Sequence, residues 1–372
     1  MIYLDSAATT YQKPSSVYKA VREAMASMTS PGRGTYGPAA RASRTLLACR
    51  EEAAALFQVE EPEGVVLTFN ATHGLNIAIH SLVKPGANVL LSGYEHNAVT
   101  RPLASIPDLH VEVVRAPLFC PSLFLEELRR RLNHPVDVVI CTHVSNVFGY
   151  VLPMEEIAAL CRRRQVPLIV DASQSAGILP VRLADWGAAF VAMPGHKGLY
   201  GPQGTGLLLC SQPGQPLLAG GTGSLSRQAE MPDFLPDRLE AGTHNVPGVA
   251  GLLAGLRFLR RRGIASLLRH EQALVRQTVE GLRRLSGVQV YAAEEKDCQS
   301  GVVSFRLTGR DPGWVAEALA QRGIAVRAGL HCAPLAHASG GTEATGTVRV
   351  SFSAFNTAQE VERFLRTLGR LR

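Results

Sequence analysis

Lysine is scarce in this 372-residue chain, although basic residues as a whole are not. Nearly all of the 38 basic residues are arginine, and the lysines are Lys13, Lys19, Lys84, Lys197 and Lys296. All but one lie in polar or turn-like stretches, as solvated surface charges usually do. The exception, Lys197, follows the apolar run AFVAM and stands among glycines, which let a ligand approach the main chain closely. This setting indicates that Lys197 serves a function other than folding.

Long hydrophobic runs and a leader-like start are also missing. No run approaches the roughly 20 apolar residues that cross a bilayer. Residues 1–14, MIYLDSAATTYQKP, lack a basic region followed by an apolar segment. Seven cysteines are scattered without a CxxC pair, which argues against a disulfide framework or a zinc site and for reduced thiols. We therefore expect a cytoplasmic enzyme without a metal, a membrane anchor or a secretory signal.

The net charge of +7 has no accompanying nucleic-acid motif. Arginines cluster at 128–132, 161–165 and 259–263, each near the end of an expected helix, where cations interact favourably with the helix dipole. No aromatic interleaving accompanies them. We expect the charge to attract anionic small molecules, and we expect no nucleic-acid partner.

The alternation of apolar runs and amphipathic stretches predicts an α/β fold. Seven strands are expected at 65–69, 88–92, 111–116, 136–141, 167–173, 190–193 and 205–210, with helices between several of them, notably 122–132 and 154–164. Continuous apolar strands separated by helices predict a mainly parallel seven-stranded sheet covered on both faces. Ligands of such sheets bind at the carboxyl ends of the strands.

The pattern changes after about residue 245. A helical region at 248–286 precedes short strands and helices that are typical of a smaller α+β domain. We expect a large domain at 16–245 and a small domain formed by 246–372 together with residues 1–15.

Polar side chains follow five successive strands: Thr72, His96, Asn146, Asp171 with Gln174, and His196 with Lys197. Taken singly, Thr72, His96 and Asp171 are equally well explained as helix caps. Together they match what pyridoxal phosphate requires, because its phosphate binds a helix start, its ring nitrogen a carboxylate, its phenolic oxygen amide donors, and its aldehyde a lysine. The residues therefore predict pyridoxal phosphate as cofactor, joined to Lys197.

The motifs YLDSAATT, EHNAV, VDASQSAG, GHKGLYGPQGTG, VRAGLHCAPLAH and VRVSFSAFNT occur in this order along the chain. With them the chain resembles, over essentially its whole length, the cysteine desulfurase and selenocysteine lyase family of class V fold-type-I pyridoxal phosphate enzymes. The resemblance implies that Lys197 is the lysine bound to the cofactor, that Asp171 pairs with the ring nitrogen and that His96 stacks on the ring. The other implied cofactor contacts are Thr72, Ala71 and His196 at the phosphate, Asn146 and Gln174 at the phenolic oxygen and substrate, and Thr222 of a glycine-rich loop (219–226) that crosses from the partner subunit of a homodimer.

Cys332 is the cysteine with no easy structural explanation. It lies between His331 and a proline turn and near Arg327, an electropositive setting that favours a thiolate. The resemblance implies that Cys332 takes sulfur from the substrate as a persulfide, on a short ordered loop. It also implies that Arg349 holds the substrate carboxylate, which suits a planar guanidinium, with Arg327 as a second candidate. Without the resemblance, Arg349 is equally consistent with a strand residue facing solvent.

The sequence thus predicts a cysteine desulfurase that converts L-cysteine to L-alanine and is expected to accept selenocysteine as well. Two departures stand out: Gly195 occupies a position where relatives carry serine or threonine, and segment 335–346 differs, which leaves the sulfur-acceptor protein open. One alternative is a class V aminotransferase or β-lyase in which Cys332 is incidental. Another is a non-catalytic binding or regulatory protein on the same fold, which the presence of both Lys197 and Asp171 disfavours.

Overall fold

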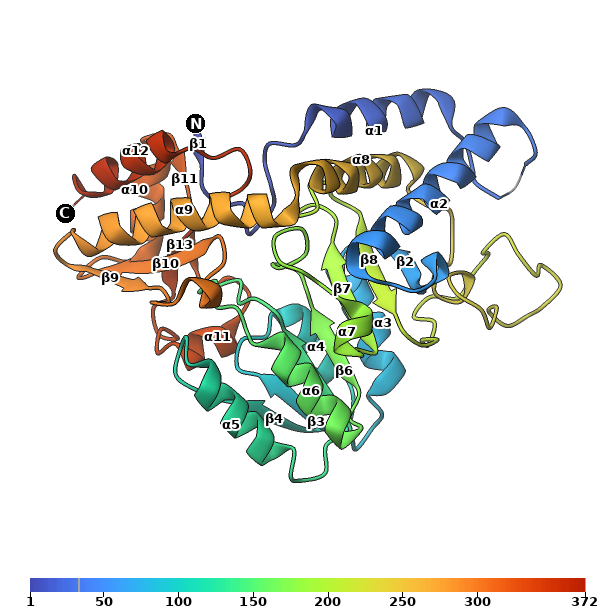
Figure 1. Ribbon diagram of the computed structural model, residues 1–372, viewed down its shortest axis with the longest axis horizontal. Helices are drawn as coiled ribbons and strands as arrows, with labels where there is room; N and C mark the ends of the chain where they lie inside the picture. Colours follow the sequence, from blue (N-terminus) through green and yellow to red (C-terminus); the bar gives the residue numbers. More distant parts are fainter. Residues whose placement is uncertain (33, 372) are drawn as a thin grey trace.

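A seven-stranded sheet forms the centre of the computed structural model, which describes residues 1–32 and 34–371 (Figure 1). The strands, in sheet order, are β2 (Val65–Thr68), β8 (Gly206–Cys210), β7 (Phe190–Pro194), β6 (Leu168–Asp171), β5 (Val138–Thr142), β3 (Asn88–Ser92) and β4 (His110–Val114). β8 runs antiparallel to both of its neighbours, and the other pairs are parallel. The predicted α/β class and the mainly parallel seven-stranded sheet are confirmed.

Alternate residues of each strand enter two different hydrophobic cores. In β6, Ile169 packs on one face, whereas Leu168 and Val170 pack on the other. The first face is covered by α3 (Ala71–Leu82) and α4 (Asn97–Ala104). The second is covered by α2 (Gly37–Phe57), α5 (Pro121–Arg131), α6 (Met154–Arg164), α7 (Leu183–Trp186) and α8 (Val246–Arg262). Burial on both faces explains why the strands other than the largely exposed edge strand β4 are continuously apolar.

A second, antiparallel sheet lies toward the C-terminus and has the order β12 (Arg327–Gly329), β13 (Thr347–Ser351), β10 (Val302–Leu307) and β9 (Val288–Tyr291). The core beside it contains residues of α9 (Ile264–Arg283), α10 (Pro312–Ala320) and α12 (Ala358–Leu368). The short helix α11 (Pro334–Ser339) and 3-10 turns at Pro62–Gly64, Asp237–Leu239 and Lys296–Cys298 complete the elements.

The N-terminus joins this second sheet region. Strand β1 (Ile2–Tyr3) pairs in parallel with β11 (Ile324–Ala325), and Asp5 bridges to Ser351. The chain then crosses to α1 (Ser15–Ser27), which packs on α8 (Figure 1). Residues 4–14 therefore connect the region of the small sheet to that of the large one.

The helical region expected at 248–286 consists of two helices, and the first ends at Arg262, where the arginine cluster at 259–263 indicated a helix end. Gly263, with φ of 76°, separates α8 from α9 in a left-handed conformation that suits glycine. α8 packs on α1 and α2, beside the large sheet. The domain boundary at residue 245 stays a prediction, and the packing of α8 favours a boundary at Gly263.

None of the helices in the described ranges combines the length and the apolar character that a bilayer span requires.

Candidate active site

A cavity of about 220 Å³ opens at the carboxyl ends of the central strands. Its walls include all of the predicted site residues except Cys332 and Thr222, namely Ala71, Thr72, His96, Asn146, Asp171, Gln174, His196, Lys197, Arg327 and Arg349. The strand ends of the large sheet supply most of them, and the small sheet supplies both arginines. The cavity therefore lies where the two sheet regions meet.

The start of α3 offers unpaired backbone donors to the cavity. The Asn70 side chain caps the helix by accepting from the N–H of His73 at 2.9 Å. Among the described residues, nothing accepts a hydrogen bond from the N–H groups of Ala71 and Thr72 or from the Thr72 hydroxyl. Free N–H groups and the positive end of the helix dipole together favour an anion.

Asp171, the last residue of β6, is a buried carboxylate without a cationic partner in the described chain. Its side chain is 3% exposed, and its Oδ1 accepts from the N–H of Ser173 at 2.9 Å. No arginine, lysine or histidine among the described residues lies within ion-pair distance of it. A charge in this position is costly unless a cation meets it from the cavity. The alternative that Asp171 caps the next helix is wrong, because the chain forms a turn after Asp171 and the next helix begins only at Leu183.

Lys197 carries a free amine. No hydrogen bond joins its Nζ to another described residue, whereas its carbonyl accepts from Thr10 Oγ1 at 3.3 Å. Burial lowers the pKa of Lys197 to about 8, with Asp171 opposing the shift. The next residue, Gly198, has no room for a side chain, because an added Cβ would lie 2.3 Å from the Ala176 carbonyl oxygen. A lysine that is partly neutral near physiological pH is a competent nucleophile toward an aldehyde.

Two neutral histidines lie beside Lys197 in the cavity wall. His96 caps α4, and its Nδ1 accepts from the N–H of Ala98 at 3.0 Å, which assigns the proton to Nε2. Burial lowers the pKa of His96. The ring of His196 contacts Thr9 Oγ1 at 3.0 Å, and burial lowers the pKa of His196 to about 4. Both rings are therefore uncharged aromatic surfaces at neutral pH.

Gly195 is closely packed against Thr205. A Cβ at this position would lie 2.1 Å from Thr205 Oγ1. A serine or threonine here would have to displace Thr205, so the departure at Gly195 matches its local packing.

Arg349 lies deep in the wall of the cavity. Its side chain, on β13, is 1% exposed, so the alternative of a solvent-facing strand residue is wrong. Nη1 donates to the Asn146 carbonyl at 2.8 Å, and Nη2 donates to Asp5 Oδ1 at 2.7 Å. The buried Nε has no partner among the described residues. A buried guanidinium N–H without a partner is unusual in a folded protein.

Cys332 is exposed, in contrast to the other cysteines, which are buried or half-buried. It lies on the four-residue connection between β12 and α11, outside the residues that line the cavity, although its neighbour His331 does line it. Arg327 Nη2 lies 3.8 Å from its Sγ, and its carbonyl accepts from the N–H of Asn97 at 2.8 Å. The thiol is therefore anchored next to α4 at the edge of the site.

Thr222 is not brought to the cavity by its own chain. It contacts Ser224 within the loop 219–226, which lines a separate pocket. Its contact with the phosphate of a partner subunit stays a prediction.

Sequence reasoning missed the part that the N-terminal segment plays in the site. The carbonyl of His196 accepts from Thr9 Oγ1, Thr10 Oγ1 and Lys13 Nζ, the last at 2.8 Å. The carbonyl of Ala7 accepts from Gln174 Nε2 at 2.9 Å. The motif YLDSAATT marked the family, but nothing in its composition showed which residues these side chains contact.

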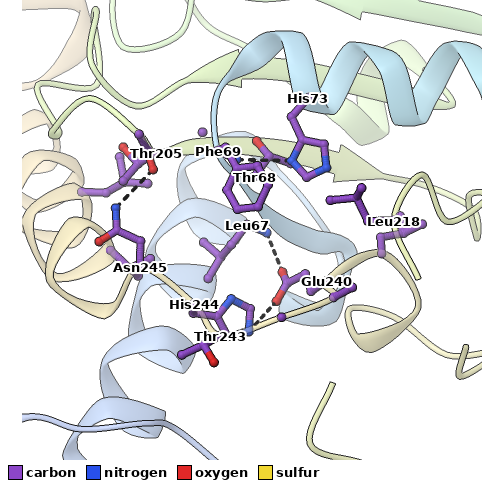
Figure 2. Close-up of a pocket in the computed structure, with 17 residues that line it drawn as sticks. Leu67, Thr68, Phe69, His73, Thr205, Leu218, Glu240, Thr243, His244 and Asn245 are labelled. Atoms are coloured by element: carbon purple, nitrogen blue, oxygen red, sulfur yellow. Dashed lines mark hydrogen bonds and ion pairs between the residues drawn. The ribbon is translucent and has the colours of Figure 1, made fainter. Parts of the chain in front are cut away.

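A second, unpredicted pocket lies beside β2 and the segment before α8 (Figure 2). Glu240 is buried at its edge, where it pairs with Arg50 at 2.6 Å, contacts His244 Nε2 at 3.2 Å and accepts from the N–H of Leu67. These contacts fix the end of the 211–245 segment against β2, whose continuation leads into α3.

The profile of the aminotransferase class-V family matches residues 2–364. The chain belongs to this family. Probable cysteine desulfurases of Mycolicibacterium paratuberculosis and Methanothermobacter thermautotrophicus are each 32% identical to the whole chain, which spans 55% of the first protein and 94% of the second. The apo structure of a cysteine desulfurase from Thermococcus onnurineus NA1 is 32% identical and superposes with a TM-score of 0.91, over 100% of this chain and 94% of that one. Class-V aminotransferases are pyridoxal phosphate enzymes, in agreement with the cofactor predicted from the strand ends.

Proposed function

We propose that this chain is a pyridoxal phosphate-dependent cysteine desulfurase that moves sulfur from L-cysteine to Cys332 and releases L-alanine. One observation carries the proposal most strongly. A free buried amine on Lys197 and an unpaired buried carboxylate on Asp171 line one cavity, and the exposed thiol Cys332 stands at its edge. The full-length similarity to cysteine desulfurases supports it.

The residues of the cavity fit the cofactor. The free N–H groups of Ala71 and Thr72 suit its phosphate, and the Lys197 amine suits its aldehyde. The Asp171 carboxylate suits a protonated ring nitrogen, which would supply the cation that the buried site lacks. When bound, the cofactor supplies an electron sink for the electrons of a bond broken at the substrate's α-carbon.

The chain's own groups divide the remaining work. Arg349, which lines the cavity, binds the substrate carboxylate. The Lys197 amine takes the α-proton and later returns a proton to carbon. The Cys332 thiolate then attacks the substrate sulfur: a sulfur–sulfur bond forms, the carbon–sulfur bond breaks, and its electron pair stays on the carbon that becomes the methyl group of alanine. A persulfide remains on Cys332 until an acceptor protein removes the outer sulfur.

Selenocysteine would follow the same route, since selenium leaves more readily than sulfur. We also propose a cytoplasmic location, because all seven cysteines are free and thiols are kept reduced in that compartment.

The proposal includes a homodimer. Large apolar side chains are exposed in the segment between β8 and α8, namely Leu217, Leu218, Leu225 and Phe234. Leu218 and the half-exposed Phe69 line the pocket of Figure 2 together. Exposed apolar groups gathered on one segment are typical of a protein interface. A sedimentation-equilibrium mass of one chain at micromolar concentration would contradict the dimer.

The deciding experiment measures alanine, sulfide and selenide release side by side from a panel of amino acids that includes cysteine, selenocysteine and cysteine sulfinate. We expect alanine from L-cysteine without any keto acid, together with a persulfide on the peptide that contains Cys332. Turnover that requires a keto acid and leaves Cys332 unmodified would identify an aminotransferase instead. Binding of amino acids without turnover would identify a non-catalytic protein.

A further inference from the structure

Asp5 holds the guanidinium of Arg349 from the N-terminal segment. Its Oδ1 lies 2.7 Å from Arg349 Nη2, and its backbone bridges to Ser351, two residues beyond Arg349 on β13. Asp5 does not line the cavity, whereas Arg349 does. The acid therefore acts on the arginine and does not reach the space where a substrate binds.

The second support of Arg349 comes from the opposite sheet region. Nη1 donates to the Asn146 carbonyl at 2.8 Å, and the Asn146 side chain donates to the His331 carbonyl, also at 2.8 Å. The guanidinium is thus fixed at both terminal nitrogens by partners from two separate segments. Nε is the buried donor that remains without a partner.

A guanidinium is planar, so two fixed nitrogens determine where the third points. Loss of the contact with Asp5 leaves only the Asn146 contact, about which the group can turn. Asp5 also supplies the only carboxylate within ion-pair distance of Arg349 in the described chain, and its negative charge opposes the lowering of the Arg349 pKa by burial. Asp5 therefore contributes both to the orientation of the Arg349 guanidinium and to the balance of its charge.

We propose that Asp5 is a positioning residue, which orients Arg349 so that the substrate carboxylate meets its free N–H groups. The inference rests on the proposed function, because it takes Arg349 as the carboxylate-binding residue. Asp5 would act on substrate affinity and leave the later chemistry at Lys197 and Cys332 unchanged.

The test compares Asp5→Ala with Asp5→Asn in the holoenzyme. We expect Asp5→Ala to raise the KM for L-cysteine about 10-fold and to change kcat less than about 3-fold, since a charged hydrogen bond of this kind corresponds to roughly that factor. Asp5→Asn keeps an acceptor oxygen beside Nη2 and should raise KM less than about 3-fold. An equal rise in KM in the two variants would overturn positioning by hydrogen bonding. An unchanged KM in Asp5→Ala would overturn it as well.

A double-variant cycle separates positioning from general destabilisation. In an Arg349→Ala background, Asp5→Ala should add no further rise in KM, because its target is gone. If the two substitutions raise KM by independent factors that multiply, the proposal is overturned. The matched control is Asp311→Ala, which removes an exposed aspartate that caps α10 through one hydrogen bond of 3.0 Å. This control should leave KM unchanged.

A binding measurement keeps the two proposals distinguishable. L-cysteine is titrated into the Cys332→Ser holoenzyme, with and without Asp5→Ala, and L-alanine is titrated in parallel by calorimetry. If wild type binds L-alanine but releases none from cysteine, the proposed function fails, while the effect of Asp5→Ala on the alanine Kd still decides the role of Asp5. A Kd that Asp5→Ala leaves unchanged overturns that role whatever the reaction proves to be.

Discussion

At the residue scale, the site contains polar side chains that are buried without the hydrogen-bond or ion-pair partners that buried groups usually have. Asp171 has no cation, Lys197 has no hydrogen bond at Nζ, and Arg349 has an orphaned Nε. Buried polar groups are usually paired, and the described chain leaves others without a partner as well, such as Trp186 Nε1. What distinguishes these three is that they line one cavity. A cofactor and a carboxylate would complete all three.

The strand-end residues were predictable because parallel strands place their carboxyl ends along one edge. Thr72, His96 and Asp171 follow apolar runs, and that position alone was enough to bring them together. Asp5 was not predictable, because its partner Arg349 lies 344 residues away and no periodicity encodes that contact.

Replacing Lys197 by alanine should abolish covalent attachment of the cofactor. We expect the wild-type protein to be yellow, with a visible absorption band that borohydride removes and a cofactor adduct on the peptide containing Lys197. Lys197→Ala should lose turnover by a factor of about 10³ or more, because its general base and its nucleophile are the same group. Lys19→Ala, which removes an exposed lysine paired with Glu23, serves as the control. A borohydride-stable adduct in Lys197→Ala would contradict the assignment.

Replacing Cys332 by serine should nearly abolish alanine formation from L-cysteine, because no other exposed thiol in the described chain can accept the sulfur. Exchange of the α-proton with solvent should continue, since it depends on Lys197. Activity with selenocysteine should fall much less. Cys120→Ser, at a half-buried cysteine, should behave as wild type. Alanine release at the wild-type rate from Cys332→Ser would make the thiol a bystander.

At the scale of elements, apolar periodicity located most helices and strands but not how they are grouped. The single helical region at 248–286 is broken at Gly263, and its halves pack on different cores. Glycine has a low helix propensity and commonly follows a helix end, and the arginine cluster at 259–263 had indicated a helix end at this place. We made no prediction for α1 or α2; α2 is rich in alanine and has a weak apolar stripe, whereas α1 is clearly amphipathic and could have been predicted.

Helix α9 carries a buried carboxyl group whose behaviour with pH is testable. Glu271 is 3% exposed, and burial raises its pKa to about 8. The folded state therefore keeps a proton that the unfolded state releases above its ordinary pKa of 4.5. The contribution of protonated Glu271 to the free energy of unfolding is therefore fully present below pH 4.5, and it is lost as the pH rises through about 8.

Glu271→Gln keeps the shape of the side chain and removes the titration. We expect the variant's melting temperature to exceed that of wild type by several degrees at pH 9, and this advantage should shrink toward pH 5. Glu280→Gln, on the exposed face of the same helix, should show no such trend. A difference that is constant across the pH range would show that Glu271 is not the group responsible.

At the scale of the whole molecule, the N-terminal segment is the connection on which the site depends. Between Asp5 and Lys13 it contacts Arg349 of the small sheet and Gln174, His196 and Lys197 of the large one. Loss of this segment removes partners from both sides of the cavity at once.

Deletion of residues 1–10 should therefore weaken cofactor retention more than it weakens the fold. We expect the truncated protein to keep the far-ultraviolet circular dichroism of wild type and to lose pyridoxal phosphate during gel filtration, with a Kd raised at least about 10-fold. Equilibrium dialysis measures that constant. Deletion of residues 366–372, which begins in the last turn of α12, tests truncation at the other terminus, and cofactor binding should be unaffected. Equal retention in both truncations would show that the segment is dispensable.

Because Cys332 is the exposed cysteine, it can be labelled selectively and used to follow events at the site. Under native conditions, a maleimide or a chromogenic disulfide should label one cysteine per chain, because the other described cysteines are buried or half-buried. His331 and Cys332 both adopt positive φ values, 50° and 56°, which only a firmly anchored loop sustains in residues other than glycine. A fluorophore attached to Cys332 would lie on a rigid loop beside the cavity. Its signal would therefore report the binding and release of small molecules and not motion of the loop.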